Sequence, residues 1–305
     1  MGTPKFAVPI LDILCSKHDV VLVVSQPDYY DYRKKRNIPS PVVEHARNLG
    51  LNIIQPKKIS KAVEEIKTHQ ADIIVTAAYG QFVPKQILDY PKYQSINVHG
   101  SLLPKYRGGA PIQRAIINGD EKTGISIIYM TAKMDAGDIL AQEELFIEES
   151  DNQDSLFEKL SLLGRKMIIP VLSKIKKGRA VAKKQDESQV SFAYNLTKED
   201  ELLKFNVSAK DVFNKIRGLN SNPGAYFVLS GINIKVYNSY VSTITSNYPP
   251  GIIVDVGKDC FSVSCKDNTV ISITEIQPAG KRRMSVRDYL NGQGKNIIKL
   301  EKEIQ

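Results

Sequence analysis

The chain has 305 residues, 42% hydrophobic and 25% charged, a composition typical of globular proteins and unlike that of disordered or fibrous chains. This length is about twice the commonest domain size, which predicts two domains and excludes a small disulfide-stapled scaffold. Lys and Arg outnumber Asp and Glu by 42 to 33, and this excess of +9 favours an anionic partner, nucleic acid above all.

The first half of the chain alternates short apolar, β-branched runs with helical stretches. Strands are expected at residues 20–24, 51–54, 72–77, 95–98 and 124–129, and helices at residues 41–49, 57–69, 111–118 and 153–177. Apolar runs of this length suit strands that are covered on both faces, and strand–helix alternation is typical of parallel sheets. The pattern predicts an α/β domain with a mostly parallel sheet over residues 1–181.

The second half has a different pattern. A polar stretch at residues 183–189 indicates a linker, which we place at residues 182–199. A helix is expected at residues 208–217, with Ser208 as its N-cap and Asp211 at its third position. Short alternating runs at residues 225–229, 232–236, 251–256, 261–265 and 269–276 then predict a small β-barrel or sandwich over residues 200–305.

Polar side chains capable of catalysis follow two of the expected strands. Asn97 and His99 are two residues apart, so they share one face at the carboxyl end of a strand, where ligands bind in open parallel sheets. Asp135 and Asp138 follow the strand at residues 124–129 in a second loop. Spacing does not choose between these aspartates, and both also suit a turn.

An amide, an imidazole and a carboxylate together suit transfer of a formyl group to an amine. The amide N–H can donate to the developing oxyanion, the imidazole can take the proton of the attacking amine, and the carboxylate can orient the imidazole. By spacing alone, Asn97 and His99 could equally be a loop cap and a satisfied histidine.

Several motifs resemble one enzyme family. Residues 97–108 read Asn-x-His-x-Ser-Leu-Leu-Pro-x-Tyr-Arg-Gly and residues 134–138 read Met-Asp-x-Gly-Asp, which is similar to the core of formyltransferases that use 10-formyltetrahydrofolate. Further matches at residues 2–9, 26–28, 39–42, 78–80, 109–113 and 276–284 span nearly the whole chain. They resemble the methionyl-tRNA formyltransferases in particular.

The resemblance implies a Rossmann-like first domain, a C-terminal barrel similar to an OB fold, and formylation of methionyl-initiator tRNA for translation initiation. It implies Asn97, His99 and Asp135 as the catalytic residues, and thereby chooses Asp135 over Asp138. It implies no metal ion, and it places the formyl donor, 10-formyltetrahydrofolate, at the following residues: Ser101, Leu102, Leu103, Pro104, Tyr79 and Gly80.

Three basic clusters could contact the phosphates of a tRNA. They are residues 33–36, six Lys or Arg within residues 174–184, and residues 281–287. The resemblance implies that the first cluster, Arg33, Lys34, Lys35 and Arg36, lies in a loop that enters the acceptor arm. Aromatic residues at positions 29, 30 and 32 replace the glycine and proline usual there, and could stack on an unpaired base.

The start of the chain departs from the family pattern. Family members carry a short apolar strand before Gly-Thr-Pro, whereas here Met1 precedes Gly2 directly and residues 6–14 look helical. Loss of some four buried side chains would remove about 6–12 kcal/mol, comparable to the stability of a whole domain. We therefore expect the natural chain to start several residues upstream of Met1.

Two other functions are consistent with parts of the sequence. A sugar-nucleotide formyltransferase would share the catalytic core, and a non-catalytic tRNA-binding protein could keep the scaffold. The three cysteines form no Cys-x-x-Cys pair and no apolar run approaches the roughly 18 residues of a membrane span. We expect a cytoplasmic monomer with no membrane partner, which binds a small-molecule folate and initiator methionyl-tRNA.

Overall fold

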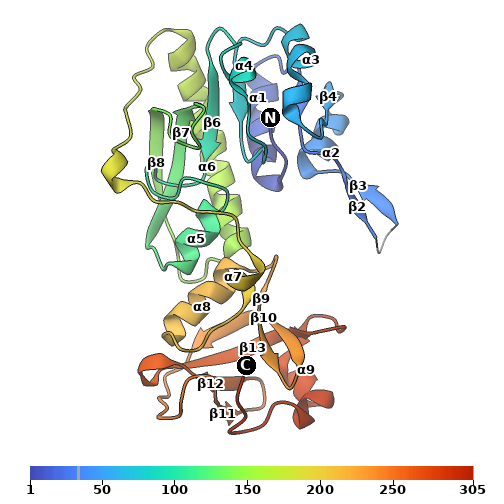
Figure 1. Ribbon diagram of the computed structural model, residues 1–305, viewed down its shortest axis with the longest axis vertical. Coiled ribbons are helices and arrows are strands. Elements are labelled where there is room, and N and C mark those ends of the chain that lie inside the picture. Colours follow the sequence, from blue (N-terminus) through green and yellow to red (C-terminus); the bar gives the residue numbers. More distant parts are fainter. Residues whose placement is uncertain (33–34, 305) are drawn as a thin grey trace. The chain divides into compact units, whose positions relative to one another are not determined.

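The computed structural model describes residues 1–32 and 35–304, and these form two compact units (Figure 1). Unit 1 comprises Met1–Pro111, Lys122–Phe146 and Phe157–Tyr194, and unit 2 comprises Ile112–Glu121, Ile147–Leu156 and Asn195–Gln305. The expected linker, residues 182–199, is divided between them, because its residues up to Tyr194 belong to unit 1.

Unit 1 contains the α/β part of the chain. Its helices are η1 (Lys5–Ala7), α1 (Val8–Lys17), α2 (Pro41–Asn48), η2 (Ile59–Lys61), α3 (Val63–Thr68), α4 (Lys85–Leu88) and η3 (Glu187–Gln189). Its strands are β1 (Val23–Val24), β2 (Tyr29–Asp31), β3 (Arg36–Ile38), β4 (Ile53–Ile54), β5 (Ile74–Thr76), β6 (Ser95–His99), β7 (Lys122–Tyr129) and β8 (Ile139–Phe146). Helices α5 (Pro111–Ile117) and α6 (Gln153–Lys176) have residues in both units.

The strands of unit 1 form one sheet of order β5-β6-β7-β8, the parallel pair β1-β4 and the hairpin β2-β3. Strands β5 and β6 are parallel, as expected, but β6-β7 and β7-β8 are antiparallel. The expectation of a mostly parallel sheet is therefore wrong for β7 and β8. Strand β8 was not expected, and the short connection from β7 leaves an antiparallel hairpin as the natural pairing.

Helix α6 fixes which face of β6 carries the polar residues. Gly164 in α6 lies so close to the sheet that a Cβ atom there would sit 3.0 Å from the Val98 side chain. Because side chains alternate along a strand, Asn97 and His99 point to the opposite face. Figure 1 shows α6 behind β6 and β7, so the helix covers one face of this sheet.

Unit 2 contains the antiparallel part of the chain. Its sheet has the order β11-β12-β13-β10-β9, with β14 paired to β13. The strands are β9 (Ala225–Leu229), β10 (Ile232–Val241), β11 (Ile253–Val256), β12 (Phe261–Ser264), β13 (Val270–Pro278) and β14 (Met284–Ser285). The helices are α7 (Lys198–Glu201), α8 (Ala209–Gly218), η4 (Lys266–Asn268), α9 (Val286–Leu290) and η5 (Gln293–Asn296). No pairing between β9 and β11 closes this sheet within the described residues, so an OB-like barrel stays a prediction.

Helix α8 begins and packs as its sequence predicts. The Ser208 hydroxyl accepts from the Asp211 N–H and the Asp211 carboxylate accepts from the Ser208 N–H, which completes a capping box. The helix packs against β10 and β13, and its Val212 and Ile216 join the buried cluster around Phe227. The hydrophobic core of unit 2 therefore lies between this helix and the sheet.

None of the helices within residues 1–32 and 35–304 is long and apolar enough to cross a membrane.

Candidate active site

The carboxylate of Asp135 brings together the three residues that the resemblance implies for catalysis. Its Oδ1 accepts from Asn97 Nδ2 at 3.2 Å, and its Oδ2 accepts from the Gly108 N–H at 2.9 Å. The same Oδ2 lies 3.6 Å from Nδ1 of His99. The side chains of His99 and Asp135 are only 6% and 15% exposed, so their interaction is weakly screened by water.

The amide of Asn97 has a fixed orientation. Its Oδ1 accepts from the Thr76 hydroxyl at 2.7 Å, and this hydroxyl comes from the neighbouring strand β5. The amide nitrogen therefore faces Asp135. One of its two N–H bonds is used by that carboxylate, and the second has no partner among the described residues.

The imidazole of His99 is also oriented by the main chain. Its Nε2 lies 2.9 Å from the carbonyl oxygen of Tyr106. A carbonyl oxygen only accepts, so Nε2 carries the hydrogen and Nδ1 of the neutral ring has the free lone pair. Nδ1 is thus the basic atom, and it faces Asp135.

The loop that carries Asp135 is held by the preceding strand and by one distant segment. Asp135 has a φ of +48°, and at Gly137 a Cβ atom would lie 1.7 Å from the Tyr129 carbonyl oxygen. Gln185 donates to the carbonyls of both residues, at 2.7 and 2.8 Å. Asp138 contributes its main-chain carbonyl to Tyr129, whereas the side-chain contacts with Asn97 and His99 belong to Asp135.

Sequence reasoning missed Gln185 and Arg107 as parts of this site. The buried Arg107 guanidinium donates twice to Gln185 Oε1, at 3.0 and 2.8 Å, and pairs with Glu187 at 2.8 Å. Arg107 lies one residue before Gly108, whose N–H binds Asp135. Arg107 stands in the motif at residues 97–108. The only signal for Gln185 was a polar stretch, and that pattern equally indicates a linker.

The segment expected to bind the folate is a tight turn next to β7. The Ser101 carbonyl and the Leu103 N–H both bind the Ser126 hydroxyl, and the Leu103 carbonyl accepts from Gln142. The Leu102 carbonyl accepts from the Lys105 N–H. Leu103 is buried, whereas the Leu102 and Pro104 side chains are half-buried. The turn therefore offers a ligand mainly the side chains of Leu102 and Pro104.

Tyr79 and Gly80 follow the carboxyl end of β5, beside the end of β6 that carries Asn97 and His99. The Tyr79 carbonyl accepts from Thr3 and Gln26, and Gly80 has a φ of +87°. The Tyr79 hydroxyl is buried without a hydrogen-bond partner among the described residues, and burial raises its pKa to about 12. The Tyr79 side chain itself belongs to the buried apolar cluster that includes Val24 and Val83.

Lys35 and Arg36, two of the residues expected to contact tRNA, belong to the hairpin β2-β3. Tyr29, Tyr30 and Tyr32 are all exposed, and the rings of Tyr30 and Tyr32 meet edge to face with centroids 5.0 Å apart. Lys35 and Arg36 are exposed, and Arg36 begins β3. Arg33 and Lys34 lie outside the described residues. In Figure 1 this hairpin extends away from the sheets of unit 1.

The other two basic clusters differ in their partners. The six Lys and Arg side chains within residues 174–184 form no ion pair with a described residue. In the cluster at residues 281–287, by contrast, Arg283 pairs with Glu275 and Arg287 pairs with Asp259. Two of the four charges of that cluster are thus already compensated within unit 2.

No group of three or more His, Cys, Asp or Glu residues within the described part of the chain could hold a metal ion.

Comparisons with known proteins identify the family of the chain. The family model "Formyl transferase" matches residues 1–172, and "Formyl transferase, C-terminal domain" matches residues 195–294. A methionyl-tRNA formyltransferase of Ligilactobacillus salivarius is 48% identical over 301 residues, which cover 97% of this chain and 95% of the relative. One from Staphylococcus aureus is 41% identical and covers 98% of this chain and 96% of the relative.

Solved structures share the fold at lower identity. An N-formyltransferase from Helicobacter canadensis, in complex with folinic acid and dTDP-3-aminofucose, matches with a TM-score of 0.68 at 18% identity, over 89% of this chain and 96% of that one. The methionyl-tRNA formyltransferase from Clostridium thermocellum matches with a TM-score of 0.55 at 19% identity, over 72% and 93%. The fold alone therefore does not choose the acceptor, whereas the sequence identity does. The predicted family is confirmed: the chain belongs to the methionyl-tRNA formyltransferases.

Proposed function

We propose that Asn97, His99 and Asp135 carry out the reaction of this family, formyl transfer from 10-formyltetrahydrofolate to the α-amino group of methionyl-initiator tRNA. The observation that carries this assignment is the Asp135 carboxylate, which binds Asn97 through one oxygen and faces His99 Nδ1 through the other. A polar cluster so fully interconnected at the carboxyl end of a strand is suited to holding a reacting group in place.

His99 acts as the base in this proposal. The attacking amine forms a bond to the formyl carbon and must lose a proton, which Nδ1 of His99 can accept because Nε2–H is held by the Tyr106 carbonyl. The resulting imidazolium faces Asp135, which stabilises the positive charge. The same proton can then pass to the folate nitrogen as its bond to the formyl carbon breaks.

Asn97 stabilises the negative charge that develops on the formyl oxygen. When the amine attacks, negative charge develops on the formyl oxygen, and the second N–H of Asn97 can donate to it. Because Thr76 and Asp135 fix the amide on both sides, this donor needs little reorganisation during the reaction.

The folate is assigned to the surface formed by Ser101, Leu102, Leu103 and Pro104, with Tyr79 and Gly80 nearby. The half-buried Leu102 and Pro104 side chains suit the face of a pterin. Gly124 supports this arrangement, because a Cβ atom there would lie 2.5 Å from the Leu102 side chain.

The tRNA is assigned to the hairpin β2-β3, with Arg33, Lys34, Lys35 and Arg36 as phosphate contacts. The exposed tyrosines of the hairpin give it aromatic surfaces on which unpaired bases can stack. We assign folate binding and catalysis to residues 1–181 and further tRNA contacts to residues 200–305, joined through residues 182–199. The chain would act in the cytoplasm as a monomer.

A transfer assay tests the function directly. The purified chain is supplied with 10-formyltetrahydrofolate labelled in its formyl group, and with charged initiator tRNA or an amino-sugar nucleotide as acceptor. Label should enter the methionyl-tRNA alone. Transfer to the sugar alone would make the chain a sugar-nucleotide formyltransferase, and transfer to neither would identify a binding protein on an enzyme scaffold.

A further inference from the structure

Two aromatic side chains are stacked on the surface of unit 1, in the segment that follows η3. The rings of Phe192 and Tyr194 lie nearly parallel, with an interplanar angle of 8° and centroids 5.6 Å apart. The two residues are 50% and 64% exposed, whereas Ala193 between them is fully buried. Because alternate residues of an extended segment share a face, Phe192 and Tyr194 form one exposed surface, which we call the aromatic platform.

Main-chain hydrogen bonds pair the platform segment with the segment that follows His99. The Arg107 N–H donates to the Ser191 carbonyl at 2.9 Å, and the Ala193 N–H donates to the Arg107 carbonyl at 2.8 Å. The Tyr106 N–H donates to the Ser191 hydroxyl at 3.0 Å, and the Tyr106 carbonyl is the one that holds the His99 imidazole. The platform segment therefore lies one strand spacing, about 4.8 Å, from the main chain that orients His99.

The aromatic rings share a face of this strand pair with the contacts that hold the loop of Asp135. Phe192 and Arg107 are bridge partners, and residues opposite each other in a ladder direct their side chains to the same face. The Arg107 guanidinium donates to Gln185, which in turn donates to the Asp135 carbonyl. The aromatic platform is thus beside the contacts that position Asp135.

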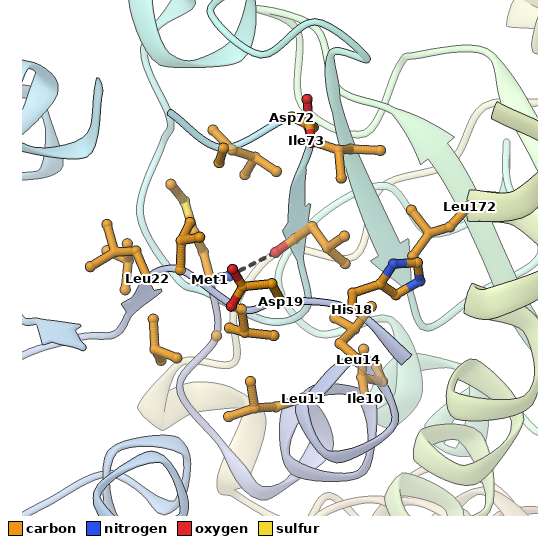
Figure 2. Close-up of a pocket in the computed structure, with 18 of the residues that line it drawn as sticks. Met1, Ile10, Leu11, Leu14, His18, Asp19, Leu22, Asp72, Ile73 and Leu172 are labelled. Carbon is orange, nitrogen blue, oxygen red and sulfur yellow. Dashed lines mark hydrogen bonds between the residues drawn. The ribbon is translucent and has the colours of Figure 1, made fainter. Parts of the chain in front are cut away.

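A cavity of about 560 Å³ beside Met1 does not hold the acceptor of the formyl group. Its lining is largely apolar and includes Leu14 of α1 and Leu172 of α6 (Figure 2). Neither His99 nor Asp135 is among the described residues that line it. An acceptor that reaches His99 must therefore be held by the surface around the site, and the aromatic platform is part of that surface.

The charged residues near the aromatic platform favour an anionic partner. Lys105 is exposed in the neighbouring segment, and the basic cluster at residues 174–184 ends eight residues before Phe192. The two carboxylates that follow this cluster are engaged, since Glu187 is in an ion pair and Asp186 caps η3. The surface thus combines ring faces for bases with cations for phosphates, as surfaces that bind single-stranded nucleic acids do.

We propose that the aromatic platform stacks on an unpaired base at the single-stranded 3′ end of the acceptor tRNA. This inference rests on the proposed function, because the methionyl ester that must reach His99 is carried on the 3′-terminal nucleotide. Aromatic side chains bind unpaired bases of any sequence through their π-faces, and the exposed rings of Phe192 and Tyr194 offer this contact. A base held there keeps the end of the acceptor beside the main chain that orients His99.

A thermodynamic cycle tests this contact. Uncharged initiator tRNA, with its unpaired 3′-terminal nucleotides either intact or made abasic so that the phosphates remain, is titrated with the unmodified chain and with the double variant Phe192→Leu/Tyr194→Leu. Removal of the bases should raise Kd for the unmodified chain about 5–100-fold, the range for loss of a stacked base. It should raise Kd for the double variant by no more than about twofold, because the stack is already lost. Equal increases for both proteins would overturn the proposal.

Steady-state kinetics separate the aromatic platform from the folate site. Phe192→Leu should raise the Michaelis constant for charged initiator tRNA about 5–100-fold and leave that for 10-formyltetrahydrofolate unchanged. Phe192→Tyr keeps an aromatic ring and should restore the original constant. Phe146→Leu, at an exposed phenylalanine of β8, is the matched control and should change neither constant. An equal rise in the constant for the folate would assign the rings to the formyl donor and contradict the proposal.

The outcomes distinguish this inference from the proposed function. If the unmodified chain does not formylate charged initiator tRNA, the proposed function is wrong. If it does, and loss of the bases weakens binding equally with and without the two rings, only the inference about the aromatic platform is refuted. Urea midpoints check that each variant folds, and Tyr194→Leu alone enters the same cycle if the double variant is unstable.

Discussion

The roles of the two nitrogens of His99 follow from the Tyr106 carbonyl. His99→Gln keeps a donor near Tyr106 but has no basic atom, so turnover should fall about 10²–10⁴-fold, the usual range for loss of a general base. Folate binding should change little, because no contact assigned to the folate involves the imidazole. The measurements are single-turnover rates and equilibrium binding of tetrahydrofolate. Near-normal turnover would remove His99 from the mechanism.

Arg33 tests the hairpin at the level of one side chain. Arg33→Ala should raise the Michaelis constant for charged initiator tRNA about 10–100-fold, as expected for loss of a charge-assisted contact. The Michaelis constant for 10-formyltetrahydrofolate should stay the same. Lys58→Ala, at another exposed cation of unit 1, is the matched control. Equal increases in both Michaelis constants would refute a specific tRNA role.

Met1 provides a prediction about stability. Burial lowers the pKa of its amine from 8.0 to about 5, so between pH 5 and 8 the unfolded chain binds more protons than the folded one. The free energy of unfolding should therefore rise with pH across this range, by at most about 4 kcal/mol. Urea titrations at pH 5, 6, 7 and 8 measure the slope. Acetylation of the amine should remove this contribution, and a slope that survives acetylation has another origin.

At the scale of elements, the segment at residues 183–193 supports the catalytic loop. Gln185 joins it to the Asp135 and Gly137 carbonyls, and the Phe192 main chain forms a bridge with Arg107. Gln185→Ala should displace Asp135 slightly and lower kcat about 10–100-fold, because small misplacements are costly to catalysis. The Michaelis constant for tRNA should not change.

The control for this element is Gln189→Ala, which removes an exposed side chain of the same segment that bonds only Asp186 among the described residues. Gln185→Glu is informative as well, because it keeps an acceptor for Arg107 but replaces the donor that serves Asp135 and Gly137. Gln185→Glu should therefore lose kcat as Gln185→Ala does. Full activity of both variants would show that the loop keeps its conformation without this side chain.

Short sequence patterns predicted those helices and strands whose conformation depends on neighbouring residues. The capping box of α8 and the alternating apolar residues of β9 both lie in the short segments that form them, and the structure has them at Ser208 and at Ala225–Leu229. The antiparallel pairing of β6 and β7 depends on a non-local contact, and the sequence between them resembles a parallel crossover. The roles of Gln185 and Arg107 likewise depend on residues nearly 80 positions apart.

The candidate site was accessible to prediction only in part. The shared face of Asn97 and His99 follows from strand periodicity alone. The choice of Asp135 over Asp138 does not follow from strand periodicity. It depends on how a turn with a positive φ directs one carboxylate back to β6. The resemblance supplied that choice, and the contacts of Asp135 explain it physically.

At the scale of the whole molecule, the net charge of +9 acts through its distribution. The cations within residues 174–184 form no ion pair with a described residue, whereas Lys122, Lys166, Lys210 and Arg287 each face a carboxylate. A cation beside a carboxylate releases fewer counterions from tRNA than an unpaired one. Two quadruple variants with the same net charge should therefore bind tRNA differently.

The first variant replaces the unpaired Lys174, Lys177, Arg179 and Lys184 by Gln, and the second replaces the four paired cations. For the first, the slope of log Kd for tRNA against log salt concentration should decrease by up to about four, roughly one for each lost phosphate contact. The second should keep most of the original slope although it loses the same total charge. Equal decreases would mean that tRNA responds only to the overall field of the molecule, and the cluster at residues 174–184 would then be an ordinary solvated surface.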